Sequence, residues 1–129
     1  MKALEASDPA TYRARMVALR EAAAALLDRV VAKDASGTVT AADAQGRAMG
    51  ALGESAGAPI VTDALARVAA IAREHGGGAK PSGAGGGDVA LGFFGRAEDA
   101  AAFRAACTEA GLTPLSLSLG AEGVRAEES

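Results

Sequence analysis

A glycine-rich decapeptide at residues 79–88, with the sequence AKPSGAGGGD, carries the residue types in this chain that are best suited to chemistry. Glycine adopts positive φ at no steric cost, so consecutive backbone N–H groups can converge into a concave nest that binds an anion. An ammonium and a hydroxyl near the start of the run can add two further donors. The pattern predicts a phosphate-binding loop formed by Lys80, Ser82, Gly83, Ala84, Gly85, Gly86, Gly87 and Asp88.

The alternative interpretation of such a run is a flexible linker. This run is not a Gly/Ser repeat, and ordered sequence flanks it on both sides. A helical pattern ends near His75, and an apolar run of strand length, residues 89–94, follows directly. Because a loop held at both ends is usually functional, the sequence favours an anion-binding loop over a linker.

The decapeptide does not match the common nucleotide-binding motifs. A Walker A loop requires a lysine followed by serine or threonine after its glycines, and no such pair is present. The dinucleotide fingerprint fails because Asp88 occupies the position of its last glycine and a strand is expected to follow.

Composition restricts the class of protein. The 129 residues suffice for one domain, and with 50% hydrophobic but 3% aromatic residues they predict close-packed helices with small contacts. The net charge of −3 and the lack of basic clusters interleaved with aromatics argue against a nucleic-acid partner. The sequence shows no signal peptide and no apolar run near the roughly 20 residues of a membrane span, which predicts a cytoplasmic protein without a membrane partner.

The first half of the chain reads as helical. Ser7, Asp8 and Pro9 predict the start of a long helix that runs to about Asp34 and is ended by Gly37 as its C-terminal cap. Its apolar stripe is formed by Tyr12, Met16, Leu19, Ala23, Leu26 and Val30. A second helix is expected from Ala41 to Leu52, because Thr40 and Asp43 resemble a capping box.

Three glycines, Gly46, Gly50 and Gly53, share one side of this second helix. Each interior glycine costs about 1 kcal/mol relative to alanine, so their presence indicates either close approach of a neighbouring backbone or mobility. Residues 53–58 are expected to form a loop, which is either the rim of a substrate pocket or a plain connection between helices.

A third helix is expected from Pro59 to His75, with Val61, Leu65, Val68 and Ala72 facing inward. His75 is the only histidine in the sequence and lies where that helix stops, so we expect a helix-end role and not catalysis. No cluster of His, Cys or carboxylate residues at ligand spacing predicts a metal site.

The second half of the chain reads as mixed. Strands are expected over residues 78–82 and 89–94, and a helix over residues 96–110 with Cys107 as a small core residue and Gly111 as its terminator. Leu115, Leu117 and Leu119 alternate with serines and predict a last strand. A fourth strand is sought near residues 37–40. The predicted class is α+β, with an antiparallel sheet covered by helices on one face.

The decapeptide resembles the third conserved motif of the GHMP small-molecule kinases, a superfamily that includes galactokinase, homoserine kinase, mevalonate kinase and phosphomevalonate kinase. Its form is most similar to that of phosphomevalonate kinase, since mevalonate kinases tend to carry another glycine in place of Asp88. The resemblance extends back through residues 57–62 and the next helix to residue 77. One departure is Val89-Ala90, where the family often has Cys-Gly.

The resemblance implies one GHMP kinase C-terminal domain over residues 1–129, with a ferredoxin-like sheet. Its parts would be a helical region at 1–76, a glycine loop and sheet at 77–120, and a polar tail at 121–129. The loop would contact the substrate phosphate, while Asp88 would fix either the loop or a nearby cation. Catalytic residues, ATP and Mg²⁺ would belong mainly to an N-terminal half that this sequence does not match.

The function implied by the resemblance is transfer of a phosphoryl group from ATP to phosphomevalonate, in the mevalonate pathway of isoprenoid biosynthesis. The expected partners are an N-terminal kinase half in cis or in trans, a small phosphorylated substrate and, as a further option, a second copy of the chain. The sequence would then be a fragment, a split-gene product or a free-standing relative. Two alternatives stay open: another GHMP kinase acting on mevalonate or a sugar, and a non-catalytic anion-binding or dimerisation module.

Overall fold

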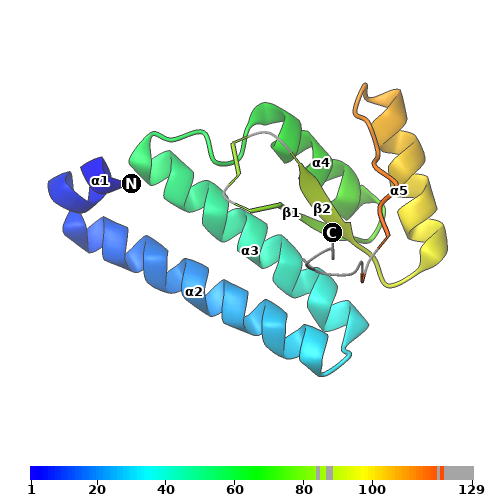
Figure 1. The fold of residues 1–129 in the computed structure, drawn as a ribbon, viewed down its shortest axis with the longest axis horizontal. Helices are drawn as coiled ribbons and strands as arrows, with labels where there is room; N and C mark the ends of the chain where they lie inside the picture. The colour runs from blue at the N-terminus through cyan, green and yellow to red at the C-terminus, as the bar shows by residue number, and fades with distance from the viewer. Residues whose placement is uncertain (84, 87–88, 119, 121–129) are drawn as a thin grey trace, which may run out of the picture.

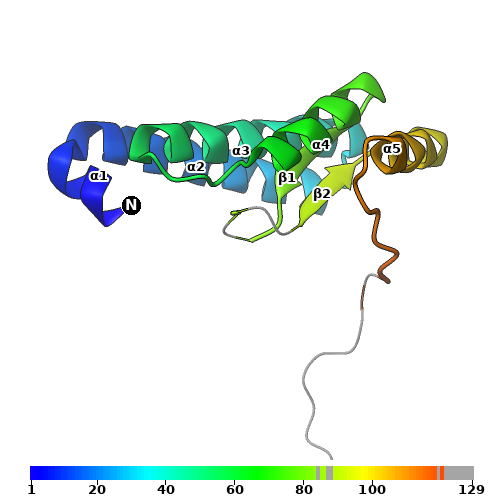
Figure 2. The same ribbon diagram turned by 90° about the horizontal axis from the view of Figure 1, so that it is seen from above.

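A computed structural model of the protein describes residues 1–83, 85, 86, 89–118 and 120. Helices form one layer, and a pair of antiparallel strands lies against one side of it (Figures 1 and 2). This arrangement confirms the predicted α+β class with a helix-covered sheet. In chain order the elements are α1 Lys2–Ser7, α2 Pro9–Val31, α3 Ala35–Ala56, α4 Asp63–Glu74, β1 Gly78–Pro81, β2 Ala90–Phe93 and α5 Ala97–Glu109.

The long helix α2 begins where the sequence predicts. Asp8 is its N-cap, and one carboxylate oxygen of Asp8 accepts a hydrogen bond from the Thr11 backbone N–H at 3.1 Å. The side chain of Asp8 therefore satisfies one of the first amides of the helix. The short helix α1 before it was not predicted; it buries Leu4, which is in contact range of the long helices.

Helix α3 differs from the prediction at both ends. It was expected from Ala41 to Leu52 but runs from Ala35 to Ala56, so Gly37 lies in its first turn and is not the C-cap of α2. The reason is Asp34, whose carboxylate accepts from the Gly37 N–H at 3.0 Å and caps α3 six residues before Thr40. The strand sought near residues 37–40 is wrong for the same reason, because these residues are helical.

Two of the three glycines of α3, Gly46 and Gly53, mark close backbone approach, which was one of the two sequence interpretations; a Cβ on Gly50 would meet only the Val61 side chain, at 3.6 Å. A Cβ atom added to Gly46 would lie 2.6 Å from the Ala79 carbonyl oxygen of β1, and one added to Gly53 would lie 2.7 Å from the Ala58 carbonyl oxygen. Side chains at these positions would push β1 and the chain after α3 outward. Helix α3 ends at Gly57, which has φ of 65° and serves as a left-handed C-cap.

Helix α4 begins at Asp63 and not at Pro59, because Thr62 caps it by accepting from the Leu65 N–H at 3.4 Å. Residues 57–62 therefore form an irregular connection. His75 is the C-cap residue of α4, which confirms its expected helix-end position. The small core is formed by Leu4, Ala41, Ala42, Met49, Leu52, Leu65, Ala72, Ala79 and Cys107.

Helix α5 lies at one end of the layer (Figure 1), and its Phe103 packs against Phe94, the residue that follows β2. The rings of Phe94 and Phe103 have centroids 4.8 Å apart and are tilted by 42°. Cys107 is 4% exposed as predicted, and this burial raises the pKa of its thiol.

The last predicted strand is wrong for the part that the structure describes. Residues 112–118 form no strand, and Leu115 and Leu117 are 53% and 77% exposed. Arg104 of α5 donates hydrogen bonds to the Leu115 carbonyl oxygen at 3.1 Å and to the Ser116 hydroxyl at 3.0 Å. These bonds occupy a carbonyl that strand pairing would need. Leu119 and the predicted polar tail at 121–129 lie outside the described residues.

Across the described residues, no helix combines the length and apolar character that crossing a membrane would require.

Candidate functional site

The predicted glycine loop connects β1 to β2 and is held at its base by strand pairing. Pro81 pairs with Ala90 in the antiparallel register, and the Ser82 N–H donates to the Val89 carbonyl oxygen at 2.8 Å. The described parts of the loop lie at the end of the sheet away from α5 (Figure 1). The loop is thus the connection of a hairpin, which agrees with the predicted strand, loop and strand order.

Three glycines of the loop adopt backbone conformations that other residues rarely take. Gly83, Gly85 and Gly86 have φ of 66°, 84° and 93°. A Cβ added to Gly83 or Gly86 would meet no atom within 4 Å, whereas one added to Gly85 would lie 2.5 Å from the Ile60 carbonyl oxygen. Glycine is favoured at Gly83 and Gly86 by conformation alone, and at Gly85 by both conformation and space.

Not all amides of the loop face a common guest, which corrects the simple picture of a nest. The Ser82 N–H bonds to Val89, and the Gly86 N–H donates to the Ile60 carbonyl oxygen at 2.9 Å. For Gly83 and Gly85, no hydrogen bond joins the amide to another described residue. Any anion bound by the described part of the loop would therefore use these two amides, and the other two hold the loop in shape.

Lys80 and Ser82 lie at the entrance of the loop, as the sequence predicts. The Lys80 ammonium is half-buried and donates to the Pro81 carbonyl oxygen at 2.9 Å, so its charge stays next to the base of the loop. Ser82 is exposed. An ammonium and a hydroxyl are donor groups that can bind an oxyanion. Ala84, Gly87 and Asp88, the remaining predicted site residues, lie outside the described residues.

Residues 57–62 form the wall against which the loop rests. The sequence analysis placed a pocket rim or a plain connection at residues 53–58, but most of that range is the last turn of α3. The residue that reaches the loop is Ile60, through its carbonyl oxygen and its side chain. The family resemblance included residues 57–62 and so could have pointed to this wall. Periodicity instead assigned Ile60 to a helix.

A charged cluster supports the helix layer behind the sheet. Asp43 of α3 accepts from Arg47 and from Arg73 of α4, each at 2.8 Å. A Cβ on Gly78 of β1 would lie 2.9 Å from the Asp43 Cβ, so β1 packs tightly beside this cluster. The Asp43 cluster therefore helps to position β1, the strand that leads into the loop.

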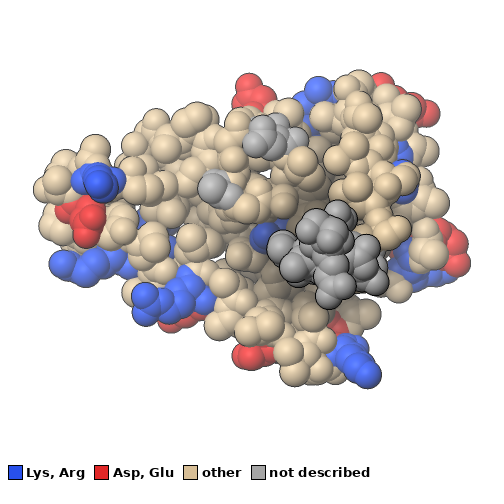
Figure 3. Space-filling view, viewed as in Figure 1, with Lys and Arg blue, Asp and Glu red and all other residues tan. Residues whose placement is uncertain are grey.

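On the face seen in Figure 3, charged side chains lie mainly around the periphery.

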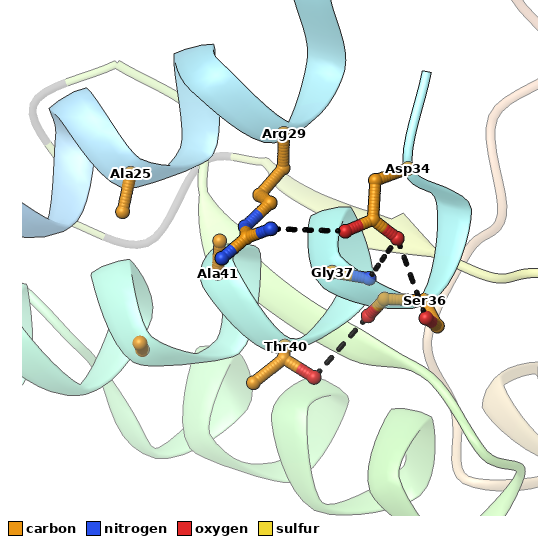
Figure 4. Close-up of a pocket in the computed structure, with 8 residues that line it drawn as sticks. Ala25, Arg29, Asp34, Ser36, Gly37, Thr40 and Ala41 are labelled. Atoms are coloured by element: carbon orange, nitrogen blue, oxygen red, sulfur yellow. Dashed lines mark hydrogen bonds and ion pairs between the residues drawn. The ribbon is translucent and has the colours of Figure 1, made fainter. Parts of the chain in front are cut away.

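A hollow away from the loop lies at the corner between α2 and α3 (Figure 4). It has a volume of about 480 Å³ and is lined by residues that include Arg29, Asp34 and Ser36. Asp34 accepts from Gly37, from Arg29 at 3.2 Å and from Ser36 at 3.4 Å. Since these bonds serve the cap of α3, the corner is a structural feature and was not a predicted site.

Within the part of the chain that the structure describes, no three His, Cys, Asp or Glu side chains come together as a metal site would require.

The fold agrees with comparisons to known proteins. Residues 38–112 match the family described as GHMP kinases C terminal, so the chain belongs to this family. The match includes the glycine loop, its wall at residues 57–62 and both strands. The family resemblance inferred from the decapeptide is confirmed at the level of the superfamily.

A solved structure shows the same fold. The crystal structure of a Lin0012 protein from Listeria innocua is 26% identical to this chain, with a TM-score of 0.80. The similarity covers 85% of this chain and 31% of the Listeria protein, so the chain corresponds to less than a third of that relative. No curated protein matches the sequence.

Proposed function

We propose that this chain is the substrate-side domain of an ATP-dependent small-molecule kinase and that its glycine loop binds phosphate oxygens. The observation that carries the proposal is the loop backbone: three glycines with positive φ lie between paired strands, inside the region that matches the GHMP kinase C-terminal family. Lys80 at the base of the loop adds a cation. Fixed amides and a cation are the groups that phosphoryl transfer requires of a protein.

The proposed substrate is phosphomevalonate, which the reaction would convert to diphosphomevalonate for isoprenoid synthesis. Support for it comes from the form AKPSGAGGGD, which is most similar to phosphomevalonate kinase, and from Asp88, which differs from the glycine usual in mevalonate kinases. A phosphorylated acceptor also suits a site whose described donors are two amides, a hydroxyl and an ammonium.

In this proposal, ATP supplies the phosphoryl group and Mg²⁺ shields its charge, and an N-terminal kinase half in cis or in trans holds both. The contribution of this chain is to bind and orient the acceptor. The Gly83 and Gly85 amides, the Ser82 hydroxyl and the Lys80 ammonium hold the acceptor phosphate, while Gly86 keeps the loop docked on Ile60. Because these donors are in place before the reaction, little reorganisation accompanies it.

The test is an NMR titration of the ¹⁵N-labelled chain with phosphomevalonate, with mevalonate as the matched ligand that lacks the phosphate. We expect the Gly83 and Gly85 amide signals to shift with phosphomevalonate and not with mevalonate. Shifts that spread over α2 and α5, or no shift at all, would contradict the proposal. Activity is then tested by mixing the chain with a GHMP kinase N-terminal half and measuring ATP turnover with each acceptor.

A second candidate is a non-catalytic anion-binding module. It is favoured by one observation: the described loop, its wall at residues 57–62 and both flanking strands all belong to this chain, so anion binding needs no other domain. Phosphate binding without ATP turnover in the presence of the N-terminal half would select this candidate. Turnover with a sugar or with mevalonate would instead select another GHMP kinase.

A further inference from the structure

Ile60 lies between two glycines that belong to different elements. A Cβ on Gly53 of α3 would lie 3.1 Å from the Ile60 Cβ and 3.3 Å from its Cγ1. On the other side, a Cβ on Gly85 of the loop would lie 2.7 Å from the Ile60 Cγ2. The side chain of Ile60 thus occupies the space between helix and loop that any residue larger than glycine at either position would need.

The backbone of Ile60 holds the same part of the loop. Its carbonyl oxygen accepts from the Gly86 N–H at 2.9 Å and would lie 2.5 Å from a Cβ on Gly85. One residue therefore contacts two consecutive loop positions, by a hydrogen bond and by van der Waals packing. These contacts adjoin Gly85, whose amide is a proposed phosphate donor.

Ile60 is itself held between two helices. The Ala58 N–H donates to the Gly53 carbonyl oxygen at 2.9 Å at the end of α3, and Thr62 caps α4 two residues after Ile60. The Ile60 N–H donates to the Ala58 carbonyl oxygen, also at 2.9 Å. The helix layer therefore fixes the position of Ile60, and Ile60 in turn fixes the position of the loop that packs on it.

We propose that Ile60 is the positioning residue of the glycine loop: its Cγ2 methyl and carbonyl oxygen hold Gly85 and Gly86, and so set the orientation of the Gly85 amide toward a phosphate oxyanion. Ile60 does not touch the ligand. This inference rests on the proposed function, because it assumes that the loop binds phosphate. A glycine-rich loop has many conformations to lose on binding, and docking on Ile60 lowers that entropic cost in advance.

The experiment compares Ile60→Val with Ile60→Leu. Valine is smaller than isoleucine but keeps a methyl branch at Cβ, whereas leucine has the same volume and lacks that branch. A residue that merely fills space would tolerate leucine better than valine. A residue that positions the loop through Cγ2 would tolerate valine better. Val61→Ala is the matched control, because the Val61 Cγ2 lies near Gly50 of α3, 3.6 Å from the place of an added Cβ.

Two readouts are measured for each variant: the hydrogen-exchange rate of the Gly86 amide, and the affinity for inorganic phosphate from an NMR titration. For Ile60→Leu we expect Gly86 exchange to be faster and phosphate affinity to be weaker, each by about tenfold, as for loss of preorganisation worth about 1.4 kcal/mol. Ile60→Val and Val61→Ala should stay within about twofold of the wild type in both.

Unchanged Gly86 exchange in Ile60→Leu would overturn the inference, and so would faster exchange with unchanged phosphate affinity. A larger effect of Ile60→Val than of Ile60→Leu would also overturn it, since volume would then decide. If the wild-type chain binds no phosphate, the proposed function fails. The Gly86 exchange rates then still decide whether Ile60 holds the loop.

Discussion

Two short connections of this molecule, the α2–α3 corner and the glycine loop, reach order by opposite means. At the corner, the Asp34 carboxylate accepts from Gly37, Arg29 and Ser36, so side chains satisfy the backbone and close the turn (Figure 4). In the loop, glycines at positive φ dock on Ile60 through backbone contacts. At the corner, every donor named here is bonded to the Asp34 carboxylate. In the loop, the Gly83 and Gly85 amides have no partner among the described residues. The comparison teaches that the corner uses its polar groups to hold the fold, whereas the loop keeps amides that suit the proposed phosphate ligand.

The largest effect is expected for Gly85→Val. Its Cβ would clash with the Ile60 carbonyl oxygen and Cγ2, and overpacking of this kind costs about 1–3 kcal/mol in addition to left-handed strain of about 1–2 kcal/mol. The loop should leave Ile60, and phosphate affinity measured by titration should fall by more than about tenfold.

The matched control is Gly95→Val, where an added Cβ meets no described atom within 4 Å and φ is not positive.

The thermal unfolding midpoint should fall only slightly in Gly85→Val, because the loop can undock while the helices and strands stay folded. Equal losses of phosphate affinity and of folding stability would remove the contrast between loop and corner.

Lys80→Met should have the next largest effect. A charge-assisted hydrogen bond contributes about 1.5–3 kcal/mol, so phosphate affinity should fall by about tenfold or more, and its salt dependence should weaken. Lys33→Met, which removes a lysine at the α2–α3 corner, is the control and should leave the affinity unchanged. An equal effect of the two variants would show that net charge, and not the loop, attracts the anion.

Gly83→Ala sharpens the comparison further, because it tests conformation without crowding. An added Cβ meets nothing within 4 Å, but φ is 66°, so the expected cost is left-handed strain of about 1 kcal/mol. Phosphate affinity from the same titration should fall by about fivefold, less than in Gly85→Val. A loss as large as that of Gly85→Val would mean that steric contact with Ile60 does not distinguish the two positions.

The smallest effect concerns the corner and its pH dependence. The hydrogen bond from the Gly37 N–H, together with the Arg29 charge, lowers the pKa of Asp34 from its ordinary value of 3.8. A carboxylate with a lowered folded-state pKa stabilises the fold above its unfolded pKa, and this contribution is lost as the pH falls through the folded value. Asp34→Asn keeps a capping side chain. It should make urea-unfolding stability less dependent on pH below about pH 4 and leave phosphate binding unchanged. A change in phosphate affinity would link the corner to the loop.

Local signals predicted the elements whose causes lie within a few residues. Asp8 and Pro9 start α2, Gly111 follows α5 with φ of 81°, and the strands flanking the glycines pair as expected. The errors arose where two local signals competed. Thr40 was expected to cap the second helix, but the Asp34 carboxylate caps it instead. The Leu-Ser alternation after α5 predicted a strand, but Arg104 binds the Leu115 carbonyl instead.

For the candidate site, the residue types and their order were visible in the sequence, and so was the family. The sequence did not show which loop amides bond to the protein itself, because this depends on a contact between Gly86 and Ile60, which lie 26 positions apart in the chain. Periodicity and turn signals involve residues only a few positions apart, so they cannot predict a contact over that separation. Ile60, the residue on which the loop rests, was accordingly assigned to a helix.

By itself the sequence determined the class of fold and the position of the glycine run between two strands, because capping, periodicity and the conformational freedom of glycine act over a few residues. Anion binding by that run stays a prediction. Only the tertiary structure decided which loop amides are engaged and which residue the loop rests on. The physical reason is that a glycine in the sequence can indicate a close contact but does not identify the contacting group. That group depends on how α3, β1 and residues 57–62 pack together.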